Sequence, residues 1–239
     1  MKKKYRISEI VLDLMFPPRC PLCDHVIEFR KGDICGECVK RVKPISGSVC
    51  MKCGKPLEEE KEYCFDCKTK KHLYVQGISA FEYRDIAASI YRFKYGGRQE
   101  YAAFFGRCMA RKLEKKIKQW KAEALVPVPV HPSRKRERGY NQAELLAKEI
   151  AVRTGVPMRC DIVARSKKTM PQKSLDGVQR QNNLKKAFKI LKNDVKLNTI
   201  VIIDDIYTTG STVDAMAAIL RTAGVKNIYY AALAIGRGQ

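Results

Sequence analysis

One stretch of this 239-residue chain, residues 199–215, constrains the fold more than any other segment. Its sequence, TIVIIDDIYTTGSTVDA, opens on a run of β-branched residues, a pattern typical of a strand that is buried on both faces. Two acids follow, then small and hydroxyl-bearing residues, and then an alanine-rich pattern that predicts a helix over residues 213–223. A buried strand, a tight loop and a helix in this order predict an α/β fold with a parallel sheet.

The loop between this strand and this helix contains the groups that a phosphate site requires. Backbone N–H groups at a helix N-terminus point at a bound anion, and the helix dipole favours its charge. Hydroxyl side chains add donors, and a glycine lets the backbone approach the ligand closely. Acids a few residues upstream suit vicinal hydroxyls or a Mg²⁺ ion. The residues concerned are Asp204, Asp205, Thr208, Thr209, Gly210, Ser211 and Thr212.

Together the acids and the loop predict a site for a ribose 5-phosphate. The stretch closely resembles the phosphoribosyl pyrophosphate (PRPP) loop of type I phosphoribosyltransferases, which is four apolar residues, two acids, two variable residues and then T-T-G-x-T. The alternative is a buried strand whose polar end only caps the next helix. The acidic pair at this spacing favours the phosphate site. Neither G-x-x-x-x-G-K-[ST] nor G-x-G-x-x-G occurs, so no P-loop or dinucleotide site is expected.

Eight of the ten cysteines lie between residues 20 and 67, all in C-x-x-C pairs. Two thiolates at this spacing bind a metal from one side, and two pairs complete a tetrahedral S₄ site that favours zinc. Two zinc sites are therefore predicted, with the ligands Cys20, Cys23, Cys35, Cys38, Cys50, Cys53, Cys64 and Cys67. Sequential pairing gives two zinc ribbons, and an interleaved cross-brace is the alternative. A disulfide framework and an iron–sulfur cluster are the other interpretations, and the strict C-x-x-C pairing disfavours the first of them.

The cysteine-rich segment divides the chain into parts. We expect a short amphipathic helix over residues 1–19, a double zinc ribbon over 20–72 that needs metal to fold, and an α/β domain over 73–239. Residues 68–72 are interpreted as a linker. No apolar run approaches 18 residues, so no membrane span is expected and the protein is predicted to be cytoplasmic. Cys108 and Cys160 stand apart from the pairs and are expected to be small buried hydrophobes.

The remaining elements follow from apolar patterns and turn residues. A second ligand loop, residues 134–142, is predicted after a strand over 124–130, and Arg138, Gly139, Asn141 and Gln142 could bind pyrophosphate there. His131 is interpreted as a turn residue rather than a catalyst. The expected strands are 74–83 (or a hairpin arm), 158–164, 188–191 and 227–235, the last of them parallel, and the expected helices are 84–95, 98–120 and 144–154.

The charge distribution points to a polyanionic partner. The net charge is +22, and the first 76 residues carry 16 basic and 11 acidic residues, whereas the remainder carries 31 and 14. Nucleic acid, a phosphorylated substrate or an anionic membrane surface would suit such an excess, and a solvated basic surface is the alternative. A polar insertion over residues 165–183 is the predicted nucleic-acid contact, through Arg165, Lys167, Lys168, Lys173 and Arg180. Nearby aromatics could stack bases or belong to the core, namely Tyr91, Phe93, Tyr95 and Tyr140.

Nearly the whole chain resembles the ComF family. The matching pieces are the paired C-x-x-C module, PVPVHPSRKRERGYNQAELLA, VIIDDIYTTGST and the spacing R-x(6)-Q-x-x-L-x(4)-R-x-x-N of Arg165, Gln172, Leu175, Arg180 and Asn183. The resemblance implies a double zinc ribbon followed by a type I phosphoribosyltransferase fold. It also implies uptake of single-stranded DNA during natural transformation, on the cytoplasmic side with a helicase partner. By the same resemblance, Asp204 and Asp205 would hold the ribose hydroxyls of PRPP with Mg²⁺, and the loop would hold the 5′-phosphate.

One position departs from the pattern of the phosphoribosyltransferases that act on 6-oxopurines. Enzymes for 6-oxopurines place a carboxylate base where this chain has Thr208, so proton removal from a purine has no agent in the loop. Two hypotheses therefore remain open. The protein is either a DNA-uptake factor with PRPP or a DNA 5′-phosphate in the loop, or a phosphoribosyltransferase whose acceptor the sequence does not identify. In the second case Asp204 and Asp205 would be the catalytic residues, stabilising a cationic sugar.

Overall fold

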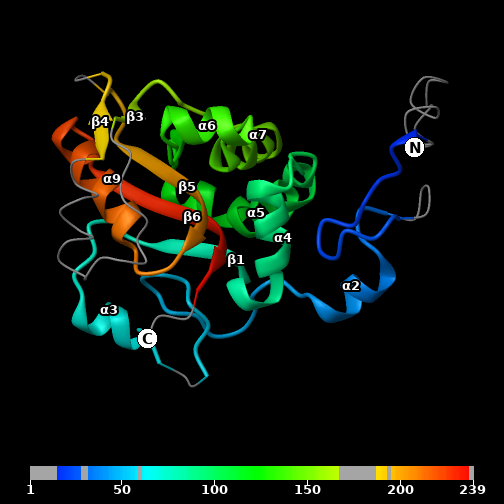
Figure 1. Cartoon of the computed structure of the whole chain (residues 1–239). Helices are drawn as coiled ribbons and strands as arrows, with labels where there is room; N and C mark the ends of the chain where they lie inside the picture. Colours follow the sequence, from blue (N-terminus) through cyan, green and yellow to red (C-terminus); the bar gives the residue numbers. More distant parts are fainter. Residues whose placement is uncertain (1–14, 28–31, 59–60, 167–186, 193–194, 237–239) are drawn as a thin grey trace.

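The computed structural model describes residues 15–27, 32–58, 61–166, 187–192 and 195–236 (Figure 1). The predicted amphipathic helix over residues 1–19 lies almost wholly outside them. Within the described part of the chain, no helix is long and apolar enough to cross a membrane. The division of the chain at residues 72 and 73 stays a prediction.

The centre of the molecule is a four-stranded parallel sheet in the order β1-β6-β5-β2. The strands are β1 (Gly77–Glu82), β2 (Ala124–Pro127), β5 (Thr199–Tyr207) and β6 (Asn227–Ile235). Alternate residues of β5 enter two different cores, with Ile200 and Ile202 in one and Val201 and Ile203 in the other. This confirms the prediction that the central strand is buried on both faces.

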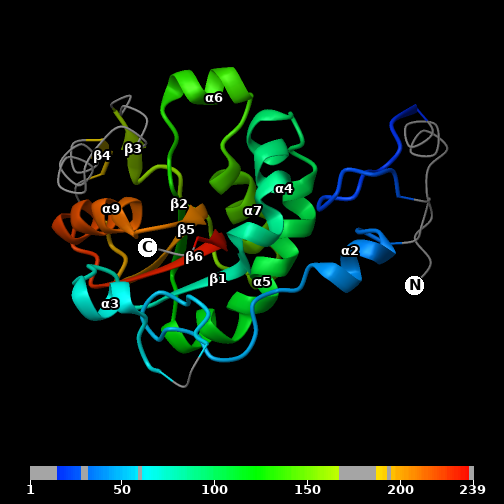
Figure 2. The same cartoon turned by 60° about the horizontal axis from the view of Figure 1, so that its bottom comes forward.

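Helices cover both faces of the sheet. On one face lie α4 (Tyr83–Tyr95), α5 (Tyr101–Trp120) and α7 (Gln142–Thr154), and on the other lies α9 (Ser211–Thr222), as Figure 2 shows. Each helix turns an apolar stripe to the sheet, for example Phe105, Met109 and Leu113 of α5. Ligands of α/β folds bind at the end of the sheet where the parallel strands terminate.

Two segments differ from the sequence-based expectation. The predicted loop over residues 134–142 contains a helix, α6 (Pro132–Arg138), whose first turn has a proline and whose N-terminus is capped by His131. The predicted strand over 158–164 does not join the main sheet. Its end forms β3 (Val163–Arg165), which pairs antiparallel with β4 (Phe188–Ile190) in a separate two-stranded sheet. Met158 makes only an isolated bridge with Leu125, because the prolines along this edge have no N–H to extend a ladder.

The two zinc ribbons share one local architecture. In each ribbon the first C-x-x-C pair lies on a turn closed by an antiparallel bridge, Arg19 with Val26 or Val49 with Pro56. The second pair lies at the start of a short helix, α2 (Gly36–Arg41) or α3 (Phe65–Thr69). We call the described parts of residues 19–42 the first ribbon and those of residues 49–70 the second ribbon. Figure 2 shows α2 and α3 on opposite sides of the molecule.

The two isolated cysteines differ from each other. Cys108 on α5 is half-buried against the core, close to the expected role. Cys160 is exposed, so the expectation that it is a buried hydrophobe is wrong. It lies where the chain has left the sheet edge between Met158 and β3, and there is no core for its side chain to enter.

Candidate functional site

Two neighbouring carboxylates lie at the end of β5. Asp204 is 9% exposed, and its Oδ1 accepts a hydrogen bond of 2.8 Å from the backbone N–H of Asp205. Burial, followed by the charge of Asp205, raises the pKa of Asp204 to about 7, although Lys94 and Arg165 act to lower it. Because burial and the neighbouring carboxylate both destabilise the ionised form of Asp204, additional positive charge or hydrogen-bond donors would stabilise it. The pair is therefore suited to a cation or to the hydroxyl groups of a sugar.

The loop after these acids has the geometry of an anion cradle. Gly210 is the N-cap of α9 with φ of +79°, and its carbonyl accepts from Asp214 N at 2.8 Å. A Cβ at this position would lie 2.6 Å from Tyr207 Oη and 2.9 Å from His72 Cε1, so only glycine fits. The first N–H groups of α9 have no partner within the helix and face the loop.

The structure brings Asp204 and the loop together around one hollow that Asp205 does not line. A single small hollow is lined by Asp204, Ile206, Tyr207, Thr208, Thr209, Gly210, Ser211, Thr212 and Val213. Thr209 Oγ1 lies 2.9 Å from Ser211 Oγ across its mouth. Hydroxyl donors and helix N–H groups are groups that bind phosphate oxygens, and a carboxylate is a ligand for Mg²⁺.

The last turn of α4 joins the acid pair to the second predicted ligand loop. Lys94 Nζ forms an ion pair of 2.9 Å with Asp205 Oδ2. The next residue, Tyr95, lies under the guanidinium of Arg138 at 4.7 Å and accepts a hydrogen bond of 3.1 Å from Arg138 Nη2. Gly139 ends α6 with φ of +81° and is exposed. Consecutive residues of α4 thus contact Asp205 and Arg138, which no pattern in the sequence indicates.

Only one of the five residues predicted to contact nucleic acid lies in the described part of the chain. Arg165 packs its guanidinium 5.4 Å from the centre of the Phe188 ring, and burial, followed by the charge of Arg134, lowers its pKa. Its charge acts on Asp204, so Arg165 lies on the acid side of the site. The other four fall outside the described residues, and their role stays a prediction: Lys167, Lys168, Lys173 and Arg180.

Several residues beneath the loop were missed by the sequence reasoning. His72, in the segment interpreted as a linker, has a buried side chain whose Nδ1 lies 2.8 Å from Asp214 Oδ2. The backbone N–H of Leu73 donates to the other oxygen of Asp214 at 2.9 Å. The linker therefore packs against the first turn of α9, and the sequence signal for it is weak because the partners lie far apart along the chain.

The eight paired cysteines form two separate clusters. Cys20, Cys23, Cys35 and Cys38 make one and Cys50, Cys53, Cys64 and Cys67 the other, with all sulfur atoms of a cluster within 4.8 Å of one another. This confirms sequential pairing and contradicts the interleaved cross-brace. The Sγ atoms of Cys23 and Cys35 are 3.6 Å apart, and those of Cys53 and Cys64 are 3.7 Å apart. Both values are close to the ~3.8 Å between sulfurs around a tetrahedral zinc ion, so both clusters fit zinc.

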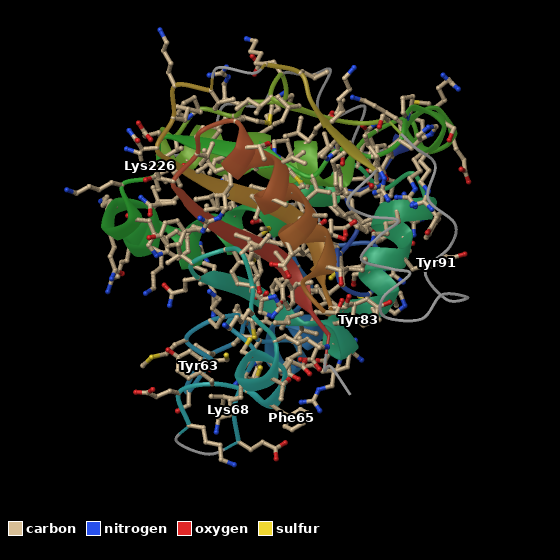
Figure 3. All side chains as sticks on the ribbon, turned by 90° about the vertical axis from the view of Figure 1, so that its left-hand side faces the viewer. Tyr63, Phe65, Lys68, Tyr83, Tyr91 and Lys226 are labelled. Carbon is tan, nitrogen blue, oxygen red and sulfur yellow. The ribbon has the colours of Figure 1, made fainter. Side chains whose placement is uncertain are left out.

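The four aromatics near basic residues divide into two pairs. Phe93 and Tyr140 belong to the core. Tyr91 and Tyr95 are 65% and 56% exposed, and their rings lie 5.1 Å apart on the outer side of α4, where Figure 3 labels Tyr91. Only the second pair could stack on a ligand.

Comparison with known proteins agrees with these observations. A double zinc ribbon domain matches residues 11–68, and a phosphoribosyl transferase domain matches residues 137–239. The chain is 30% identical over 220 residues to Competence protein F of Haemophilus influenzae, which covers 88% of this chain and 93% of that relative. It is 28% identical to DNA utilization protein YhgH of Salmonella typhimurium, covering 90% and 96% of the two chains.

Two further likenesses cover less of the chain. Competence protein ComFC of Bacillus subtilis is 30% identical over 199 residues, covering 80% of this chain and 79% of its own. A hypoxanthine phosphoribosyltransferase from Staphylococcus aureus aligns with 54% of this chain and 62% of its own at 14% identity, with a TM-score of 0.35. The domain matches, the two cysteine clusters and a relative aligned over nearly its full length show that the chain belongs to the ComF family, a double zinc ribbon followed by a phosphoribosyltransferase domain.

Proposed function

We propose that the protein is a DNA-uptake factor that binds PRPP, or the 5′-phosphate of a DNA strand, at the end of β5. The observation that carries this proposal is the single hollow lined by Asp204 and by all five loop residues from Thr208 to Thr212. In it the acids would take the ribose hydroxyls together with Mg²⁺, and the N-terminus of α9 would take the phosphate. Arg138 and Gly139 would take the pyrophosphate of PRPP, since Tyr95 places Arg138 beside the turn of α4 that contacts Asp205.

The same proposal includes single-stranded DNA as a partner. The chain carries 47 basic against 25 acidic residues, and most of the excess lies after the zinc ribbons. Tyr91 and Tyr95 offer exposed rings beside Arg138, a combination suited to stacked bases and phosphates. Relatives named for competence and for DNA utilization support this direction. We place the protein in the cytoplasm, where a helicase of the uptake machinery would be its partner.

A second function, phosphoribosyl transfer to an acceptor, is favoured by one observation. The loop and the acid pair are both present in full, although Thr208 supplies no carboxylate to remove a proton. Incubation with PRPP, Mg²⁺ and a panel of nucleobases would release pyrophosphate if transfer occurs. The absence of pyrophosphate across the panel would remove this second function and leave the binding function intact.

The decisive test of the sugar-phosphate site is calorimetric titration of the full chain with PRPP and Mg²⁺. Replacing Asp204→Asn and Asp205→Asn together is expected to weaken binding at least about tenfold, because both acceptors for the sugar and the metal are lost. Asp85→Asn, an exposed acid in the first turn of α4, is the matched control and should bind as the original chain does. Equal binding by all three proteins would contradict the site.

The DNA arm is tested by fluorescence anisotropy with a labelled single strand. Affinity should fall steeply between low and moderate salt, because the backbone charges release counterions on binding. The triple change Lys167→Glu, Lys168→Glu and Lys173→Glu should weaken binding further and flatten the salt dependence. Binding that ignores both salt and these changes would count against a DNA-binding surface.

A further inference from the structure

The loop of residues 208–212, which we call the phosphate loop, is joined to the second ribbon by a continuous row of buried side chains. The row begins at the turn that holds the first two cysteines of the second cluster. There the carbonyl of Cys53 accepts a hydrogen bond of 2.6 Å from Tyr230 Oη. Tyr230 lies in the middle of β6 and is fully buried. A zinc ligand therefore supplies, through its backbone, the acceptor for a hydroxyl in the core of the sheet domain.

The row continues through Tyr230, Tyr207 and Tyr74, which pack against one another and which we call the tyrosine block. The ring of Tyr230 stacks on that of Tyr207 with centroids 4.6 Å apart and planes 4° apart. Tyr207 Oη lies 2.7 Å from Tyr74 Oη, and the Tyr74 ring meets the Tyr230 ring edge-on at 4.9 Å. All three are buried, so a shift of one ring forces a shift of the others, since the interior is close-packed.

The block ends directly under the phosphate loop. Tyr74 stacks on His72 at 4.9 Å, and His72 Nδ1 contacts the carboxylate of Asp214 in the first turn of α9. Gly210 has no room for a Cβ because Tyr207 Oη and the His72 ring press against it. The side chains of Tyr207 and His72, which belong to the same row as Tyr230, therefore restrict the conformation of the loop.

Backbone contacts reinforce this connection. The Lys52 ammonium, in the turn between Cys50 and Cys53, donates to the carbonyl of Tyr74, and Gly77 N donates to the carbonyl of Lys52 at 2.8 Å. Gln76 Nε2 donates to the carbonyl of Met51 at 2.9 Å. The turn of the second cluster is therefore built into the start of β1. Metal binding by the thiolates contributes folding free energy to such a turn, so loss of the metal would loosen it.

We infer that the second zinc cluster is a structural part of the phosphate loop, whereas the first cluster is not. Zinc at the second cluster holds the Cys50–Cys53 turn, the turn fixes Tyr230, and the tyrosine block with His72 holds Gly210 and the start of α9. Loss of that metal would leave the Tyr230 hydroxyl buried without its acceptor, and the block would move. The inference rests on the proposed function only for the identity of the ligand, because the connection to the loop is present without one.

The first ribbon supplies the matched comparison. Its hydrogen bonds go to α4 and α5, for example from Ser89 Oγ and Arg92 Nη2 to the carbonyl of Leu22, both at 2.8 Å. We compare two full-chain variants that remove equivalent ligands, Cys35→Ser with Cys38→Ser in the first cluster and Cys64→Ser with Cys67→Ser in the second. Zinc content is measured for each, together with hydrogen exchange of the amides over residues 207–214 and PRPP binding with Mg²⁺.

The second-cluster variant should hold one zinc ion instead of two, exchange the loop amides at least about tenfold faster and bind PRPP at least about tenfold more weakly. The first-cluster variant should also hold one zinc ion but keep the loop exchange of the original chain. Equal effects of the two variants, or no effect of the second, would overturn the inference.

A milder variant guards against global unfolding of the cysteine variants. Tyr230→Phe keeps the stacked ring and both zinc sites but removes the hydroxyl that reaches Cys53. Tyr229→Phe is its control, because Tyr229 is the neighbouring residue on the other face of β6, where it stacks on Trp120 at 4.3 Å. Loop exchange should rise about threefold or more in the first variant and stay unchanged in the second; identical exchange in both would overturn the inference.

The exchange measurement also separates this inference from the proposed function. If the original chain fails to bind PRPP, the proposed ligand is wrong, while the exchange contrast between the two clusters still decides the connection. If the chain binds PRPP and the contrast is absent, the ligand stands and the connection is refuted.

Discussion

The two zinc ribbons have the same local construction and different surroundings. In each, the residue after the second cysteine of the first pair is left-handed, Asp24 with φ of 67° and Gly54 with φ of 70°. In each, the N–H of that residue donates to the carbonyl of the first cysteine at 2.8 Å. Yet cysteines of the first ribbon belong to the core on the α4 and α5 side of the sheet, and those of the second belong to the core on the α9 side.

The equivalent residues Asp24 and Gly54 show what this difference means. Asp24 extends a side chain to the domain, where Tyr101 Oη donates to it and Arg98 forms an ion pair of 3.2 Å with it. Gly54 has no side chain, and a Cβ there would lie 2.8 Å from the carbonyl oxygen of Gly77. The first ribbon is therefore attached through side chains, and the second is pressed backbone to backbone against β1. An attachment through side chains tolerates change, whereas a backbone contact does not.

The comparison also assigns each ribbon to a different half of the site. The first ribbon supports α4, whose last turn supplies Lys94 to Asp205 and Tyr95 to Arg138. The second ribbon supports the loop at the N-terminus of α9 through Tyr230 and His72. The acid pair is thus supported by the first ribbon and the phosphate loop by the second, although both follow directly from β5.

The largest expected effect on the free energy of unfolding comes from substituting the equivalent residues Gly54 and Asp24. Gly54→Ala should lower the free energy of unfolding by about 2–4 kcal/mol, because the new Cβ meets backbone atoms of β1 and a left-handed φ strains alanine. Asp24→Gly should cost less, about 1–2 kcal/mol, because the loss of the part-buried contacts with Tyr101 and Arg98 is offset in part by relief of the left-handed residue. Urea denaturation of both variants measures the contrast, and similar losses in the two would break the comparison.

Local patterns explain what could be predicted from the sequence. The β-branched run of β5, the glycine of the loop and the C-x-x-C pairs each lie within a few residues, and each fixes its own conformation or chemistry. Helix α6 was missed because PSRKRER has no apolar periodicity, and the helix is instead started by a proline and the His131 cap. Sequential metal pairing needed the structure, because both pairings satisfy the same spacing.

Contacts between distant parts of the chain could not be predicted in this way. His72 meets Asp214 across 142 residues, and Tyr230 meets Cys53 across 177. Lys94 was one of many basic residues on a basic helix, and nothing beside it in the sequence singles out Asp205 as its partner. The acids and the loop were thus predictable as a ligand site, whereas the residues that support them were not.

The next expected effect concerns the acid pair, Asp204 and Asp205, and the pH dependence of stability that it causes. The pKa of Asp204 is about 7 in the folded protein and near 3.8 when unfolded, so the folded state binds more protons in between. Stability therefore falls as the pH rises from about 4 to about 7. Asp204→Asn cannot ionise and should be more stable than the original chain at pH 8, on the order of 2 kcal/mol, with the advantage vanishing near pH 4.

Thermal and urea unfolding between pH 4 and 8 measures this difference. Asp161→Asn is the control with the opposite sign, because hydrogen bonds from Arg159 and then Lys192 hold the pKa of Asp161 well below its usual range. Its loss should appear at high pH and fade in acid. A pH-independent effect of Asp204→Asn would show that the carboxylate is ionised throughout and that the acid pair is already compensated.

The smallest expected effect isolates the first ribbon from the phosphate loop. Ser89→Ala removes one buried hydrogen bond to the carbonyl of Leu22, and Arg92 still donates to that carbonyl, so no acceptor is left unpaired. The expected cost is about 0.5–1.5 kcal/mol of unfolding free energy. Exchange of the loop amides over residues 207–214 should not change, since Ser89 lies on the α4 side of the sheet and the loop rests on the α9 side. Faster loop exchange in this variant would mean that the two ribbons communicate through the sheet, and the division of the site between two metal modules would then be wrong.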